Sequence, residues 1–62
     1  MWSIFLRFVS WLWTLVWRYG AGTISRVVAW ATANWQKVVG WILQNIAWGI
    51  ILQWILRTLG LG

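Results

Sequence analysis

The sequence predicts an all-α fold, a compact bundle of four helices without disulfide bonds. Polar residues recur at steps of three and four along most of the chain, which is the period of an α-helix. No stretch alternates polar and apolar residues as a half-buried strand does, and the chain contains no proline that would interrupt a helix. It also contains no cysteine, so helix packing alone must stabilise these 62 residues.

The first helix is expected over residues 2–18. Nearly all of its residues are apolar, and its polar residues form one narrow stripe that consists of Ser3, Arg7, Ser10, Thr14 and Arg18. The segment Tyr19-Gly20-Ala21-Gly22 comes next. Because glycine adopts positive φ without steric cost, a break is expected at Gly20–Gly22.

Three shorter helices are expected after this break, over residues 23–33, 36–44 and 47–59. Asn34 and Asn45 separate them, since asparagine is favoured at helix N-caps and tolerates the left-handed conformation that ends helices. The chain end from Leu59 to Gly62 is expected to fray. The expected apolar stripes are Ile24, Val27, Val28, Ala31 and Trp35 in the first of these helices, Trp35, Val38, Val39, Ile42 and Ile46 in the second, and Trp48, Ile51, Leu52, Ile55 and Leu59 in the third.

The segment Val38–Leu56 supports a rival structure. It contains no charged residue and approaches the length of about 20 apolar residues that spans a bilayer, so a transmembrane helix over residues 38–56 is an alternative. Gln44, Asn45 and Gln53 would each be costly inside the hydrocarbon core. The sequence therefore favours two helices that are separated at Asn45.

The composition excludes most kinds of chemistry. The chain has no Asp, Glu, His or Cys, so it lacks the usual general acids and bases and the usual metal ligands. We therefore expect no enzymatic activity, no catalytic residue, no metal and no cofactor.

Apolar residues make up 63% of the chain and charged residues only 8%. A domain this small cannot bury so much apolar surface, so part of it must face a lipid bilayer, a partner or copies of the chain itself.

Positive charge and indole side chains remain, and both favour a membrane surface. Cations are attracted to anionic lipid headgroups, and tryptophan is enriched where water meets the acyl chains. A nucleic-acid surface would need the five cations gathered on one face, whereas they are spread along the chain.

Some of the tryptophans in the first helix must be exposed, because their spacing runs around the helix. At least one of Trp35, Trp41, Trp48 and Trp54 is expected in the core. Trp30 fits a core position and an interface position equally well. The expected membrane-binding residues are Arg7, Arg18, Arg26, Lys37 and Arg57 together with Trp2, Trp11, Trp13, Trp17, Trp30, Trp35, Trp41, Trp48 and Trp54.

The segment Ser25–Trp41 resembles a known family. It carries a basic residue, an aliphatic stretch, a Trp-Ala pair, an Asn, a Lys and a further Trp at Arg26, Trp30-Ala31, Asn34, Lys37 and Trp41. This spacing is similar to the central segment of leaderless bacteriocins of the aureocin A53 and lacticin Q type, and the likeness continues without a gap to Leu59-Gly60. The resemblance implies a saposin-like four-helix bundle without disulfides, export without a leader peptide, and killing of Gram-positive bacteria by membrane permeabilisation.

The chain also departs from that family. It has four Arg and one Lys where relatives are rich in Lys, its first helix is longer and Trp-rich, and Ala21–Ile24 is an insertion. Gly40 stands where relatives often carry an acidic residue.

We expect a secreted antimicrobial protein that begins at Met1 and acts at the target cell membrane. It is expected to bind the anionic phospholipids of that membrane, where it can self-associate, and not to bind nucleic acid. The alternatives are a small integral membrane protein, such as a phage holin or coat subunit, and a circular bacteriocin.

Overall fold

The computed structural model describes residues 2–61, which form five α-helices and no strand. The helices are α1 (Trp2–Trp13), α2 (Val16–Tyr19), α3 (Ala21–Ala33), α4 (Trp35–Leu43) and α5 (Trp48–Thr58). The molecule measures 27 × 20 × 20 Å along its principal axes. The predicted all-α, compact fold without disulfides is therefore confirmed, with the first predicted helix divided in two.

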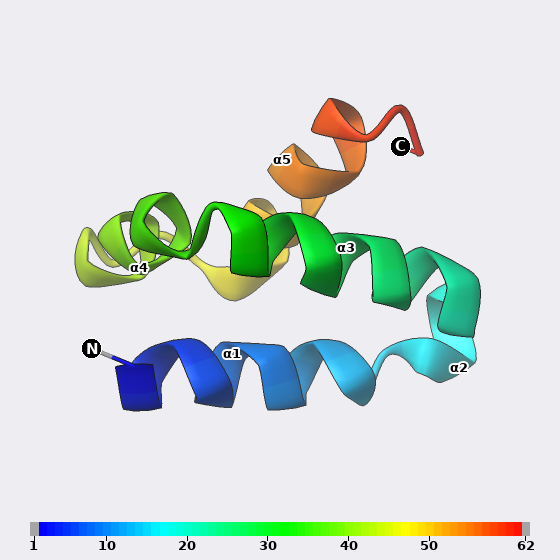
Figure 1. The fold of residues 1–62 in the computed structure, drawn as a ribbon, viewed down its shortest axis with the longest axis horizontal. Helices are drawn as coiled ribbons and strands as arrows, with labels where there is room; N and C mark the ends of the chain where they lie inside the picture. Colours follow the sequence, from blue (N-terminus) through cyan, green and yellow to red (C-terminus); the bar gives the residue numbers. More distant parts are fainter. Residues whose placement is uncertain (1, 62) are drawn as a thin grey trace.

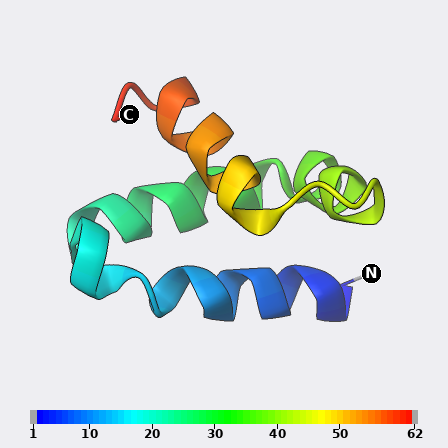
Figure 2. The same ribbon diagram turned by 180° about the vertical axis from the view of Figure 1, so that it is seen from behind.

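The helix α3 lies at the centre of the bundle and contacts each of the other four helices. Figure 1 shows α1 and α3 side by side and antiparallel, with α2 connecting them at one end. The helix α4 crosses the other end, near the start of α1, and α5 then returns across α3. Figure 2 shows the same arrangement from behind. This topology leaves the outer side of α1 and the outer sides of α4 and α5 uncovered by another helix.

The core is apolar throughout. No polar or charged side chain is buried among residues 2–61. Buried residues recur at helical spacing, which confirms most of the predicted stripes after residue 23. The buried residues are Phe5, Phe8 and Leu12 of α1, Ile24, Val27 and Ala31 of α3, Val38 and Val39 of α4, and Ile51, Leu52, Ile55 and Leu56 of α5.

The prediction of one helix over residues 2–18 is wrong, because the chain bends at Thr14–Leu15. The amides of Thr14 and Leu15 donate to the carbonyls of Trp11 and Leu12, 3.1 and 3.0 Å away, which are i→i−3 bonds that tighten the end of a helix. Leu15 and Val16 pack against the core. The Thr14 hydroxyl also donates to the carbonyl of Trp11, 2.6 Å away. The bend turns α2 towards α3, and it is held by this local bond and by tertiary packing rather than by glycine or proline.

The second predicted helix begins earlier than expected, since Gly20 alone reverses the chain. Gly20 has φ +86° and ψ 152°, a conformation open essentially to glycine only. Its amide donates to the carbonyl of Val16 at 2.7 Å, and its carbonyl accepts the amide of Ile24 at 3.1 Å. Gly20 thus ends α2 and begins α3, while Ala21 and Gly22 are helical rather than part of the break.

Asn34 forms the break between α3 and α4, as predicted. Its side-chain amide and its backbone amide both donate to the carbonyl of Trp30 at 3.0 Å. Its own carbonyl accepts the amides of Lys37 and Val38 at 3.0 and 3.1 Å. The asparagine side chain therefore caps the end of α3 rather than the start of α4, and α4 extends over residues 35–43 instead of 36–44.

Asn45 ends α4 in the left-handed conformation, with φ 64°. Its amide donates to the carbonyl of Ile42 at 3.0 Å, and the amide of Ile46 donates to the carbonyl of Trp41 at 3.2 Å. These two bonds form a Schellman motif. The break confirms two separate helices over residues 35–58, and no helix among residues 2–61 has the length and apolar character needed to cross a membrane.

The end of α5 is ordered by the same motif, so the expected fraying of Leu59–Leu61 is wrong. Gly60 has φ 73°, its amide donates to the carbonyl of Arg57 at 3.0 Å, and the amide of Leu61 donates to the carbonyl of Leu56 at 2.8 Å. Glycine supplies the left-handed conformation here without a Cβ clash. The last residue, 62, lies outside the described part of the chain.

Candidate membrane-binding surface

The five cationic side chains are all exposed, and each helix carries one. Within residues 2–61, the side-chain hydrogen bonds are made by threonine and asparagine donors to backbone carbonyls. The sequence offers no carboxylate side chain as a partner. The cations are therefore available to external anions. They are Arg7 on α1, Arg18 on α2, Arg26 on α3, Lys37 on α4 and Arg57 on α5.

None of the nine tryptophans is buried, although phenylalanine and the aliphatic residues fill the core. Four are exposed: Trp2, Trp13, Trp17 and Trp54. The other five are half-buried against the core: Trp11, Trp30, Trp35, Trp41 and Trp48. The expectation that some first-helix tryptophans are exposed is confirmed. The expectation of a core tryptophan among the last four is not met, because three of them flank the core and Trp54 is exposed.

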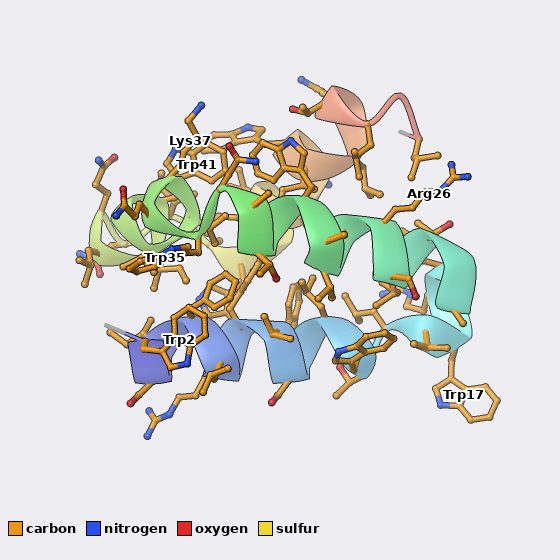
Figure 3. All side chains as sticks on the ribbon, in the orientation of Figure 1. Trp2, Trp17, Arg26, Trp35, Lys37 and Trp41 are labelled. Atoms are coloured by element: carbon orange, nitrogen blue, oxygen red, sulfur yellow. The ribbon has the colours of Figure 1, made fainter. Side chains whose placement is uncertain are left out.

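Three tryptophans from three helices contact one another on the side of the bundle away from α1. The rings of Trp30 and Trp41 are stacked, with centroids 6.3 Å apart and an interplanar angle of 13°. The ring of Trp54 meets that of Trp41 edge-on, with centroids 5.0 Å apart. We call Trp30, Trp41 and Trp54 the indole cluster. Figure 3 shows Trp41 and Lys37 on the side of α3 opposite α1.

Each member of the indole cluster has a cation about one helical turn away. Arg26 precedes Trp30 by four residues, Lys37 precedes Trp41 by four, and Arg57 follows Trp54 by three. Residues three or four apart lie on the same side of a helix. The structure therefore brings three of the predicted cations to the side of the bundle that carries the indole cluster. Arg7 and Arg18 lie on α1 and α2 instead.

A second set of tryptophans lies on the α1–α2 side. Trp11 contacts Trp48 of α5, with ring centroids 5.7 Å apart, and Trp2 meets Trp35 of α4 edge-on at 5.5 Å. These contacts attach α1 to α4 and α5. Trp13 and Trp17 project into solvent, and the Trp17 side chain is 96% exposed.

Two open hollows lie beside α4. One of about 310 Å³ lies over the corner from Ala33 to Lys37, and another of about 290 Å³ is lined by Trp35, Gln36, Val39, Gly40 and Leu43. The only ionisable group that lines them is the Lys37 ammonium. Because both hollows are open and Lys37 is the one ionisable residue in their lining, they suit contact with an extended surface better than enclosure of a small substrate.

Sequence reasoning missed several exposed apolar residues. Leu6, Tyr19, Leu43, Ile50 and Leu61 are exposed, and none of them was singled out. In the first helix, the buried residues Phe5, Phe8 and Leu12 were also not singled out. Phe5 and Leu12 lie opposite the polar stripe of the first helix, and this position would have indicated that they are buried. The residues next to them are equally apolar, so the sequence does not show where the buried side ends.

Comparison of the chain with known protein families, with curated proteins and with solved structures finds no match. The likeness to leaderless bacteriocins therefore stays a resemblance in the segment Ser25–Trp41.

Proposed function

We propose that this protein is an antimicrobial protein of the bacteriocin type, which binds the anionic membranes of bacteria and permeabilises them. One observation carries the proposal: all nine tryptophans lie at or near the surface, although the core is apolar and could have received them. Indole at a protein surface is unfavourable in water and favourable at the boundary of a lipid bilayer. The fold thus presents the side chains that suit a membrane interface.

Charge supports the same function. The net charge is +5, every cation is exposed, and no acidic residue opposes attraction to an anionic surface. Each cation near such a surface contributes about 1 kcal/mol to binding. The protein is first concentrated at the membrane by charge, and its indoles then enter the headgroup layer.

Permeabilisation follows when the bundle opens on the lipid. Because the core is entirely apolar, the inner faces of the helices can exchange contacts with one another for contacts with acyl chains. Within residues 2–61, no buried hydrogen bond between side chains has to be broken in this exchange. The protein is proposed to be secreted, to act without a cofactor at the target cell membrane, and not to be an enzyme.

The test is the response of Gram-positive cells to purified protein. We expect loss of membrane potential, measured with a voltage-sensitive dye, within the same time as loss of viability. The tryptophan emission should shift to shorter wavelength as the indoles leave water. Killing without loss of membrane potential would refute permeabilisation as the mechanism.

A further inference from the structure

The side of α1 next to its buried face carries a row of exposed apolar residues, and the first of them, Trp2, also contacts the ring of Trp35 of α4. Trp2, Leu6 and Trp13 are exposed and follow one another at steps of four and seven residues. These steps place the three side chains on one stripe of the helix, about 16 Å long at 1.5 Å per residue. We call these three residues the α1 ridge.

The α1 ridge is exposed while α1 remains packed in the bundle. Each residue advances the direction of its side chain by about 100°, so the buried residues Phe5 and Leu12 lie on a stripe next to the ridge. Ser3 and Arg7 lie on the other side of the ridge, away from the core. Around the helix, the order is therefore core, ridge and polar stripe. This order is that of a helix that lies in a membrane interface, where the long arginine side chain extends to the headgroups.

Trp17 extends the apolar surface beyond the end of α1. Its side chain is 96% exposed, and Figure 3 shows it pointing away from the bundle at the α2 end. No contact inside the fold accounts for an indole in this position. A fully exposed indole is the costliest apolar group on the surface, and it gains most on transfer to a bilayer interface.

We propose that the α1 ridge and Trp17 form the surface by which the closed bundle docks on an anionic bilayer, with α1 lying along the membrane plane. This inference rests on the proposed function and specifies the face and the state in which the protein binds. A bilayer is favoured over a second copy of the chain, because two copies of charge +5 without acidic residues repel each other, whereas anionic lipid attracts both Arg7 and Arg18. The indole cluster, on the far side of α3, faces water in this docked state.

The chain provides matched pairs of variants for the test. Leu6→Gln removes a side chain that is 48% exposed on the ridge, and Ile50→Gln removes one that is 45% exposed on α5, four residues before Trp54 and so on the side of the indole cluster. Trp13→Gln and Trp54→Gln form a second pair, with side chains 44% and 36% exposed. The measurement is the partition coefficient of each variant on phosphatidylglycerol vesicles, together with its thermal unfolding in the absence of lipid.

Leu6→Gln should lower vesicle affinity about fivefold, the factor expected when half of a leucine side chain no longer leaves water. Trp13→Gln and Trp17→Gln should each lower it by about that factor or more, while Ile50→Gln and Trp54→Gln stay within about twofold of the unmodified protein. Equal losses within each pair, or larger losses at Ile50 and Trp54, would overturn the assignment of the face.

Two further results are distinguishable from that outcome. If the unmodified protein does not bind the vesicles, the proposed function itself fails. If the ridge variants keep full vesicle affinity but change a dimer into a monomer in sedimentation without lipid, the ridge pairs two copies of the chain and does not bind lipid.

Discussion

The indole ring of Trp30 lies stacked on that of Trp41, with centroids 6.3 Å apart and ring planes 13° from parallel. The two residues belong to α3 and α4, and the stack fixes these helices on either side of the corner at Asn34. Because Trp41 also contacts Trp54 of α5, it connects three of the five helices. Trp41 is thus a structural residue, although it lies partly at the surface.

Trp41→Ala should lower the free energy of unfolding by about 2 kcal/mol. Replacing a fully buried tryptophan costs more than this, and Trp41 is only half-buried. Trp17→Ala is the matched control, because Trp17 packs on nothing, and it should change stability by less than ~0.5 kcal/mol. Urea unfolding followed by circular dichroism measures both. Equal losses would show that the indole cluster contributes no stability of its own.

Gly20→Ala should destabilise the fold by roughly 1–3 kcal/mol, because alanine is strained at φ +86° and ψ 152°. Gly22→Ala should keep or slightly raise stability, since Gly22 is helical and an added Cβ would meet nothing within 4 Å. Thermal unfolding of the two variants gives the comparison. The pair also locates the chain reversal, because a large loss at Gly22 would place that residue in the break as well.

Asn45→Ala should cost about 1 kcal/mol, because a residue with a Cβ and no side-chain amide is disfavoured at φ 64°. Asn45→Gly should keep the stability or increase it, since glycine adopts this conformation freely. Chemical shifts of Gln44–Ala47 would show whether the turn persists in both proteins. Greater helicity and stability in Asn45→Ala would indicate that α4 and α5 prefer to join.

Arg7→Gln combined with Arg18→Gln should weaken binding to anionic vesicles by about 2 kcal/mol and leave helicity intact, whereas Arg26→Gln combined with Lys37→Gln, on the side away from the membrane, should weaken it less. All four side chains are exposed, so their loss removes charge without opening the core. Arg7→Lys is the control that keeps the charge and should keep the affinity. Raising the salt concentration should reproduce the loss by screening. An affinity insensitive to both changes would contradict electrostatic capture.

Opening of the bundle can be separated from binding by a cross-link between α1 and α5. Trp11→Cys and Trp48→Cys would be joined by a short, cleavable thiol reagent, since the two rings are in contact and the chain has no other cysteine. The cross-linked protein should bind anionic vesicles but release little dye, because α1 cannot leave α5. Cleavage of the linker should restore release in the same sample. Full release before cleavage would mean that the closed bundle permeabilises the membrane.

The helices and three of their breaks could be predicted because local chemistry determines them. Asn34, Asn45 and Gly20 each supply a conformation or a hydrogen bond that ends a helix. At the Thr14–Leu15 bend, the Thr14 hydroxyl donates to the carbonyl of Trp11, but Thr32 and Thr58 make a similar bond within unbroken helices, so this bond does not mark a bend. The bend depends on the packing of Leu15 against the core. It could not be predicted without the tertiary structure.

The composition of the candidate surface could be predicted, but its location could not. Cations and tryptophans were identified as a class, whereas their faces depend on how the helices pack. Phe5 and Leu6 are neighbours of the same chemical type, yet Phe5 is buried and Leu6 is exposed. In a helix that is apolar on most sides, the position opposite the polar stripe indicates the core side, as at Phe5, but the pattern does not indicate how far around the helix burial extends.

Membrane permeabilisation is tested most directly by dye release from vesicles with purified protein and no other component. Phosphatidylglycerol vesicles should release an entrapped dye at protein concentrations that leave phosphatidylcholine vesicles intact, because the charge of +5 concentrates the protein only at the anionic surface. Helical circular dichroism of the same sample would show that the protein is folded. No release from phosphatidylglycerol vesicles by the folded protein would contradict the proposed function.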